Sequence, residues 1–390
     1  MPNLYIKDIV IEPNANDGTV AISCYAEVCL NDVSLQAKVS YQGKTVSCGC
    51  AEMVNNHTTV NLKLTENEEL HLWDVLNPDL YEVELSLQKD GEVLDTVKSY
   101  FGVRTIEIRD SKIYLNDKEL YQKLVLDQGY WRESLLTPPN EEALVSDIVD
   151  MADMGFNGVR KHQKVEDERY LYYADIMGFI VWAEMPSMYL NTEKSREIFE
   201  REWLLAVEQQ RNHPCVLTWV PFNESWGIEE IFNDKVVQDF VSDIDYKTKA
   251  VDSTRPVVTN DGWEHTISDI LTIHHYEQDG QKLHSYYDTL KKCCSEKWES
   301  HHKGAFAKGY GYKGQPIIIS EFGGTAFVKD TTGENWGYGI GVNSFDEFYE
   351  RFSSLIDAID SLPYSCGYCY TQVTDVQQEV NGLLDFDHKS

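Results

Sequence analysis

The sequence predicts an all-β sandwich of immunoglobulin type followed by an α/β domain with the (β/α)₈ barrel fold. Two observations support this prediction. Up to about residue 104, short segments alternate apolar and polar residues and are separated by turn-forming sequences. After that point, apolar strand-like runs alternate with amphipathic helical segments, which is typical of parallel βα units. We therefore place the sandwich at residues 1–104 and the barrel at residues 105–390.

The first part shows the two-residue period of half-buried strands. Turn signals, such as Asn16-Asp17-Gly18, separate the periodic segments. About seven strands in roughly a hundred residues favour an immunoglobulin-type sandwich. No loop gathers acids, histidines or aromatics, so a structural role is expected for this part. The clearest predicted strands are residues 5–10, 19–25, 35–39 and 60–64.

The second part opens with a predicted strand pair at residues 106–108 and 112–115. Eight barrel strands with intervening helices are then expected. The predicted barrel strands are residues 124–127, 158–160, 179–184, 216–220, 257–260, 270–276, 315–321 and 367–371. The helix after the first strand should begin after Asn140, end at Gly155, and bury Leu144, Ile148, Met151 and Met154.

Two of these buried strands end on carboxylates. The run at residues 216–220 is followed by Asn223 and Glu224, and the run that begins near residue 315 ends on Glu321. Barrel enzymes keep their chemistry at the C-terminal ends of the strands, where the loops open to substrate. The fourth and seventh strands face each other across a barrel, so the two glutamates are expected to meet. Paired carboxylates are the equipment of glycoside hydrolysis.

Several phrases resemble glycoside hydrolase family 2, the family of β-galactosidases, β-glucuronidases and β-mannosidases. The acid/base signature of that family is similar to Arg211-Asn212-His213-Pro214 running into Asn223-Glu224-Ser225, and its nucleophile strand to Ser320-Glu321-Phe322-Gly323. Other phrases occur in the family's order: Asn77-Pro78-Asp79-Leu80-Tyr81, Phe101-Gly102-Val103-Arg104, Met154-Gly155-Phe156-Asn157-Gly158-Val159-Arg160 and Thr371-Gln372-Val373-Thr374-Asp375-Val376. The resemblance spans essentially the whole chain.

The resemblance implies a retaining β-glycosidase, most similar to β-galactosidases, with Glu224 as general acid/base and Glu321 as nucleophile. Their carboxyl groups should lie about 5 to 5.5 Å apart, and the acid should have a raised pKa. Arg160 is the expected cationic partner of Glu321, and Tyr276 its hydroxyl donor. His162 stands near the family's histidine, although the phrase Arg160-Lys161-His162 is one residue shorter. Further expected sugar partners are Asn223, Trp182, Glu184, Asn260 and Gln372, with the faces of Trp219 and Trp226 available for stacking.

Composition excludes several other functions. Lys+Arg number 34 against 65 Asp+Glu, and the net charge of −31 repels nucleic acid and anionic membranes. The chain has no apolar run long enough to span a membrane and no signal peptide, and its nine cysteines are irregularly placed. A cytoplasmic location is therefore expected. The pairs His274-His275 and His301-His302 suggest a metal, but no carboxylate is expected to complete a site. Neither a metal nor a cofactor is predicted, since retaining glycoside hydrolysis needs none.

The expected partner is a carbohydrate, and two alternatives to the exo-acting β-glycosidase stay open. One is an endo-β-glycanase of a related barrel family, which would have an open groove. The other is a fragment that binds carbohydrate with little turnover. The family's N-terminal jelly roll and last barrel helix are not recognisable, so the sequence resembles an interior piece of a longer enzyme. This leaves open further domains or a homo-oligomer.

Overall fold

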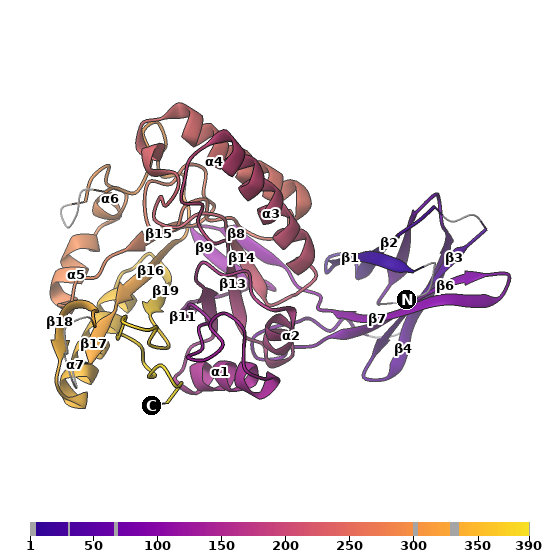
Figure 1. Cartoon of the computed structure of the whole chain (residues 1–390), viewed down its shortest axis with the longest axis horizontal. Coiled ribbons are helices and arrows are strands. Elements are labelled where there is room, and N and C mark those ends of the chain that lie inside the picture. The colour runs from indigo at the N-terminus through magenta and orange to yellow at the C-terminus, as the bar shows by residue number, and fades with distance from the viewer. Residues whose placement is uncertain (1–4, 30–31, 66–68, 299–302, 328–334, 390) are drawn as a thin grey trace. The chain divides into compact units, whose positions relative to one another are not determined.

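The computed structural model describes residues 5–29, 32–65, 69–298, 303–327 and 335–389. The chain forms two compact units (Figure 1). One unit runs through Thr105 and takes in residues 175–178 and 211–214, and the other holds the remainder. Within these described ranges, no helix is long and apolar enough to cross a lipid bilayer.

The first unit is a β-sandwich of two antiparallel sheets, as predicted. One sheet has the order β1-β2-β5 and the other the order β4-β3-β6-β7. The first sheet contains β1 (Ile6–Asn14), β2 (Thr19–Ala26) and β5 (His57–Lys63). The second contains β3 (Ser34–Tyr41), β4 (Lys44–Glu52), β6 (Tyr81–Lys89) and β7 (Glu92–Phe101).

The core of this unit follows from the alternation in its strands. In β6, Tyr81, Val83 and Leu85 are buried, and Glu82 and Glu84 between them are exposed. The buried residues belong to the same apolar cluster as Ile22 of β2, from the other sheet. The polar residues of each strand therefore point to water and the apolar ones fill the space between the sheets.

The second unit is a (β/α)₈ barrel that a short antiparallel sheet of order β10-β9-β8 precedes. That sheet consists of β8 (Ile106–Arg109), β9 (Lys112–Leu115) and β10 (Lys118–Glu119). Seven parallel strands follow the order β14-β13-β12-β11-β19-β16-β15. They are β11 (Gln122–Asp127), β12 (Gly158–Lys161), β13 (Ile180–Glu184), β14 (Val216–Val220), β15 (Leu271–His274), β16 (Ile317–Gly323) and β19 (Ser365–Thr371).

The fifth barrel position differs from the prediction, because residues 257–260 do not form a continuous strand. The chain there makes only isolated parallel bridges to the β14 side, Trp219 to Val257 and Asn223 to Asp261. The backbone N–H groups of Val257 and Thr259 donate to the side chains of Asp269 and Ser268, at 2.8 and 2.9 Å. Side chains therefore accept the hydrogen bonds that these N–H groups would otherwise donate to a neighbouring strand. The segment still closes the barrel, since the N–H of His274 donates to Gly262 O at 3.3 Å.

The helices lie outside the barrel strands (Figure 1). They are α1 (Glu141–Asp153), α2 (Glu168–Met177), α3 (Glu193–Gln210), the 3₁₀ helix η1 (Glu229–Phe232), α4 (Lys235–Val251), α5 (Gly280–Tyr287), α6 (Leu290–Cys293) and α7 (Phe345–Asp360). Two short strands, β17 (Thr325–Phe327) and β18 (Tyr338–Val342), precede α7. Residues 261–270, which connect the fifth barrel position to β15, form bends and isolated bridges instead of a helix.

The predicted start of α1 is confirmed by its cap. The side chain of Asn140 accepts a hydrogen bond from the N–H of Ala143 at 2.8 Å. Leu144, Ile148 and Met151 are buried as expected. Met154 is not, because it lies at the C-cap, and it is 40% exposed.

Candidate active site

Glu224 and Glu321 meet at the C-terminal ends of the barrel strands. Glu321 lies in β16, and Glu224 lies in the turn after β14. One carboxylate oxygen of each residue and a ring nitrogen of His274 all lie within 4.8 Å of one another. The side chain of Glu224 is 22% exposed, against 5% for that of Glu321. Glu224 is therefore the more accessible of two facing acids.

Glu321 is held by donors from three other elements. Its Oε1 accepts from Arg160 Nη1 at 2.9 Å, and its Oε2 accepts from the hydroxyl of Tyr276. His274 Nδ1 lies 3.5 Å from the same Oε2. The Tyr276 ring stacks on that of Tyr338, with centroids 3.4 Å apart, which fixes the direction of its hydroxyl. The carboxylate is thus fixed in position and surrounded by positive charge.

Arg160 connects the ends of several strands. Its guanidinium is fully buried and contacts three carboxylates, at 2.6 Å to Glu184, 2.6 Å to Asp261 and 2.9 Å to Glu321. It also donates to Asn223 Oδ1 at 2.8 Å. Burial alone would lower the pKa of Arg160, but these carboxylates raise it well above its ordinary value. The arginine is therefore a permanent cation that orients the site.

His162 does reach this cluster, despite the shortened phrase in which it occurs. Its Nδ1 lies 3.1 Å from Glu184 Oε1 and 4.0 Å from Glu321 Oε1. Burial opposes protonation, but the charge and hydrogen bond of Glu184 raise the pKa of His162 overall. Both carboxylate oxygens of Glu184 accept hydrogen bonds, one from Arg160 and the other from the N–H of Gln163. Its expected role as a sugar partner is wrong, because it orients two residues that face the site.

A strained turn carries Glu224. Glu224 and the following Ser225 have φ angles of +51° and +60°, in the left-handed region that such residues rarely occupy. Asn260 fixes this turn, because its Oδ1 accepts from the N–H of Ser225 at 2.9 Å and its Nδ2 donates to Ser225 Oγ at 3.1 Å. Ser225 Oγ in turn donates to Glu264 at 2.8 Å. Asn260 is fully buried. It supports the turn and was wrongly expected to bind sugar.

Three other expected sugar contacts are also corrected by burial. Trp182 is fully buried and donates its indole N–H to Gln122, at the start of β11, at 2.7 Å. Trp219 is fully buried and donates to Asp252. Gln372 is fully buried and bonded to Gln128 and Asn381. None of these side chains has a surface on which a sugar could stack or bind, whereas Trp226 is 51% exposed.

Asn223 keeps its expected position. Its Oδ1 accepts from Arg160 at 2.8 Å, which fixes its amide group beside the two glutamates. Four of the predicted binding residues thus surround the two glutamates: Asn223, Arg160, His162 and Tyr276.

His274 is a central residue whose place in the site was not predicted. Its Nδ1 lies 2.8 Å from Glu224 Oε1, and its Nε2 lies 3.2 Å from Asp261 Oδ2. Burial opposes protonation, but the charges of Glu321 and Asp261 and the hydrogen bonds to Asp261 and Glu224 raise the pKa of His274 to about 10. His274 and Tyr276 are two residues apart, which places them on one face of a strand. That spacing was the signal for His274.

The cationic neighbours reverse one expectation about Glu224. Burial favours its neutral form, but the hydrogen bond and charge of His274 outweigh burial, and the pKa of Glu224 is lowered. The expectation of a raised pKa for Glu224 is therefore wrong. The sequence did not show which side chain would contact the acid.

A third acid, Glu379, lies at the rim of the site. Its carboxylate accepts from Gln128 Nε2 at 3.1 Å and from Asn381 Nδ2 at 3.2 Å. Burial raises its pKa against these hydrogen bonds, and it interacts electrostatically with both His162 and Glu321. Glu379 lies in the loop after the last strand, where the sequence shows no periodic pattern to place it.

The cluster of Glu224, His274 and Glu321 has the composition of a metal site. His274 does have carboxylate neighbours, contrary to the sequence-based expectation. A divalent cation here would also meet Arg160, whose Nη1 is 2.9 Å from Glu321. Two positive charges so close together would repel each other strongly in a buried site. The arrangement therefore fits two carboxylates held by His274, Arg160 and Tyr276 better than a metal centre. His301 and His302 lie outside the described residues.

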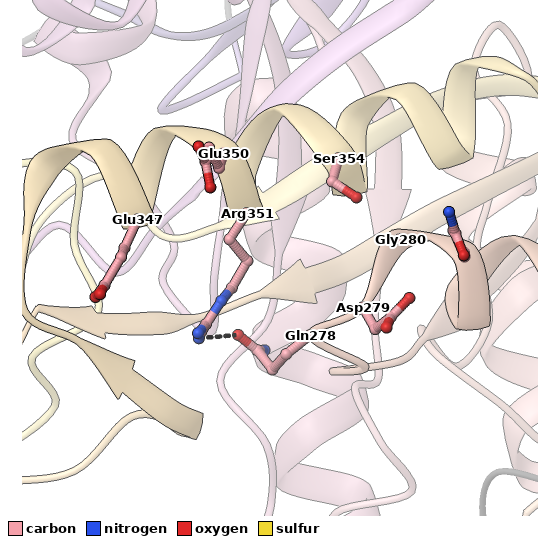
Figure 2. Close-up of a pocket in the computed structure, with 8 residues that line it drawn as sticks. Gln278, Asp279, Gly280, Glu347, Glu350, Arg351 and Ser354 are labelled. Atoms are coloured by element: carbon pink, nitrogen blue, oxygen red, sulfur yellow. Dashed lines mark hydrogen bonds between the residues drawn. The ribbon is translucent and has the colours of Figure 1, made fainter.

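A separate pocket of about 520 Å³ lies between α5 and α7. Figure 2 shows Arg351 of α7 reaching toward Gln278, whose Oε1 is 3.2 Å from Arg351 Nη1. Gln278 also donates to Gly323 O at 2.6 Å, at the end of the strand that carries Glu321. The pocket is acidic, with Asp279, Glu347 and Glu350 in its lining. The hydrogen bond from Gln278 to Gly323 O supports the end of β16 from outside the barrel.

A β-sandwich, a (β/α)₈ barrel and two facing glutamates at the strand ends are the combination found in barrel glycoside hydrolases. Comparison with known proteins identifies the family. Residues 4–104 match the profile described as glycosyl hydrolases family 2, and residues 106–333 match that of the family 2 TIM barrel domain. The chain belongs to glycosyl hydrolases family 2.

Relatives with two different names are similarly close. A β-glucuronidase of Streptococcus agalactiae is 29% identical over 176 residues, covering 40% of this chain and 29% of the relative. A β-galactosidase of Thermoanaerobacter pseudethanolicus is 28% identical over 239 residues, covering 59% of this chain and 32% of the relative. The chain therefore spans about a third of the length of these relatives.

Solved structures share the fold. An FMN-binding β-glucuronidase from Facaelibacterium prausnitzii superposes with a TM-score of 0.78 at 17% identity, covering 100% of this chain and 62% of that chain. At this level of identity, the likeness shows the fold alone.

Proposed function

We propose that this chain carries the active site of a retaining β-glycosidase, with Glu321 as nucleophile and Glu224 as general acid/base. The observation that supports it most is the facing pair, with carboxylate oxygens within 4.8 Å. Retaining enzymes hold their two carboxyl groups about 5 to 5.5 Å apart, whereas inverting enzymes need about 6.5 to 9.5 Å for a water molecule. An oxygen-to-oxygen spacing within 4.8 Å is closer to the retaining range than to the inverting one.

The surroundings of each acid support the division of roles. Glu321 is buried and fixed by Arg160 and Tyr276, as suits a nucleophile that must approach one sugar carbon in one direction. Glu224 is the more exposed acid, as suits a group that must reach both the leaving oxygen and an incoming water. In the first step Glu321 attacks the anomeric carbon while Glu224 protonates the leaving oxygen. In the second, Glu224 takes a proton from water as water displaces Glu321.

We propose a neutral β-linked sugar, such as a β-galactoside, as the substrate rather than a uronide. A uronate would add a negative charge near Glu379 and Glu321. The cations beside the acid pair are already engaged, because Arg160 contacts three carboxylates, His162 contacts Glu184, and His274 contacts Glu224 and Asp261. A neutral hydroxymethyl group has no such electrostatic cost, and Glu379 can accept a hydrogen bond from a sugar hydroxyl.

A panel of 4-nitrophenyl β-glycosides tests both parts of this proposal. The panel contains the galactoside, glucoside, mannoside and glucuronide, with the Glu224→Gln/Glu321→Gln double variant as background. We expect hydrolysis of a neutral glycoside with retention, seen as β-sugar product by proton NMR. Faster hydrolysis of the glucuronide would overturn the substrate class. Binding of the glycosides without hydrolysis above background would overturn the catalytic assignment and favour a carbohydrate-binding fragment.

A further inference from the structure

His274 lies between the two acids, and its ring contacts are unusual for a side chain that carries no chemistry of its own. Nδ1 is 2.8 Å from Glu224 Oε1 and 3.5 Å from Glu321 Oε2, while Nε2 is 3.2 Å from Asp261 Oδ2. The ring is therefore bonded on both nitrogens to carboxylates. The guanidinium of Arg160 also lies close, with its Nη1 3.4 Å from Nε2.

The ring is also held in place by backbone. Gly262 has a φ of +104°, and a Cβ there would lie 2.6 Å from the Nδ1 of His274. The N–H of Gly262 donates to Thr272 Oγ1 at 3.0 Å, and this hydrogen bond joins the loop to β15. The indole of Trp263 meets the ring edge-on, with centroids 5.7 Å apart. Close backbone contact on one side and carboxylates on the others leave the imidazole a single orientation.

We propose that His274 is the proton reservoir of the acid/base: it holds a proton on Nδ1 in the free enzyme and passes it to Glu224 when a glycoside binds. This inference rests on the proposed glycosidase function. In this role His274 does not contact the reacting atoms. It is a positioning residue that acts through Glu224.

The proton transfers balance over the full reaction. On binding, the proton moves from Nδ1 to Glu224 Oε1, which leaves a neutral ring whose Nε2–H still donates to Asp261. Glu224 then gives the proton to the leaving oxygen as the glycosidic bond breaks and the bond from Glu321 to the anomeric carbon forms. In the second step, Glu224 removes a proton from water as the water oxygen bonds to the anomeric carbon and the bond from Glu321 to that carbon breaks. The proton then returns from Glu224 to Nδ1.

The charges of the site make this transfer physically reasonable. In the free site the raised pKa of His274 and the lowered pKa of Glu224 describe an ion pair, with the proton on the ring. A bound sugar removes water from the exposed side of Glu224. Desolvation penalises the charged forms of both partners and favours the neutral pair, which is the form that can donate to an oxygen.

Histidine NMR tests the location of the proton without requiring activity. The chain has 11 histidines, and the signal that is lost in His274→Asn identifies His274. In ¹⁵N-histidine-labelled wild-type protein, both ring nitrogens should have imidazolium shifts at pH 7.5. In Glu224→Gln, which removes one of the carboxylates, the titration midpoint of His274 should fall. A neutral His274 ring in the wild type at pH 7.5 would overturn the proposal.

Leaving-group kinetics test the transfer itself. His274→Asn should reduce kcat/KM for 4-nitrophenyl β-D-galactoside by about 10²-fold, the lower range for loss of acid catalysis. The 2,4-dinitrophenyl galactoside, whose leaving group needs little protonation, should lose much less. His275→Asn, at the next position, is the matched control and should show no such difference. An equal loss on both substrates in His274→Asn would mean that the residue is only structural, and would overturn the proposal.

The two experiments separate this inference from the proposed function. A wild-type chain that hydrolyses no glycoside but shows an imidazolium at His274 would count against the glycosidase proposal. An active chain with a neutral His274 would count against the proton reservoir alone.

Discussion

Arg160 Nη1 lies 2.9 Å from Glu321 Oε1, and this buried contact joins the second and seventh strands of the barrel across its interior. The same guanidinium contacts Glu184 and Asp261, so one side chain compensates three buried carboxylates. Removing a single partner of a buried pair leaves uncompensated charge, which costs about 3 to 5 kcal/mol. Arg160 therefore orients Glu321 together with Tyr276, which donates to the other carboxylate oxygen.

Arg160→Met should destabilise the chain by about 3 to 5 kcal/mol in urea unfolding, because three acids lose their cation. Arg160→Lys should destabilise it less but still lower kcat/KM by about 10²-fold or more, since an ammonium cannot make the same forked contacts. Arg109→Met is the control. Arg109 pairs at a surface where its side chain is 41% exposed, and its loss should destabilise the chain much less than the loss of Arg160. Equal effects at both positions would contradict the role of Arg160.

Asn260→Ala should lower kcat with little change in KM. The Asn260 amide bonds Ser225 and Trp263, so its loss leaves the N–H of Ser225 without a partner and loosens the turn that carries Glu224. A buried unsatisfied donor costs about 1 to 3 kcal/mol, which urea unfolding would detect. If KM rises and kcat is unchanged, Asn260 contacts the sugar after all.

Glu379→Gln should raise the ratio of kcat/KM for 4-nitrophenyl β-D-glucuronide over the galactoside. Glu379→Lys should raise it further, because it places a cation where a uronate would lie. The expected change in the ratio is about 10-fold or more for the lysine variant, the effect of about 1.4 kcal/mol. The exposed Glu142→Gln changes charge far from the acids and should leave the ratio as it is. An unchanged ratio in Glu379→Lys would remove the argument for a neutral sugar.

Stability should depend on pH through His265. Burial lowers the pKa of His265 from 6.5 to about 4, so in the folded chain its ring stays neutral down to that pH. Between pH 6.5 and 4 the unfolded chain binds more protons, and stability falls as pH falls, by up to about 3 kcal/mol. Urea unfolding at pH 4.5 and 7 should show a smaller pH difference in His265→Asn than in wild type. Parallel curves for the two proteins would contradict a buried neutral ring.

Periodicity predicted the fold because both units bury their strands in regular ways. The alternation in β6 and the apolar runs of β14 and β16 correspond to burial in the structure. The exception is the fifth position, where Asp269 and Ser268 take hydrogen bonds that a strand would share. No local pattern distinguishes a side-chain acceptor from a neighbouring strand.

Within the candidate site, the sequence did not show how far each side chain reaches along the barrel axis, and this limited the prediction. Alternation shows that Trp182 and Glu184 share a face, but not that the Trp182 indole reaches the start of β11. Likewise, a polar residue at a strand end can face the substrate or a neighbouring turn. Asn260 does the latter because the left-handed turn at Ser225 needs its amide. Contacts between distant segments decide such cases.

Trapping of the covalent intermediate tests the central claim most directly. Incubation with 2,4-dinitrophenyl 2-deoxy-2-fluoro-β-D-galactoside should add one fluorosugar to the chain, and peptide mass spectrometry should place it on Glu321. Glu224→Gln should still be labelled, since this leaving group needs little protonation, whereas Glu321→Gln should not. A wild-type chain that turns over β-galactosides with inversion, or that carries the label on Glu224, would contradict the assignment of Glu321 as nucleophile.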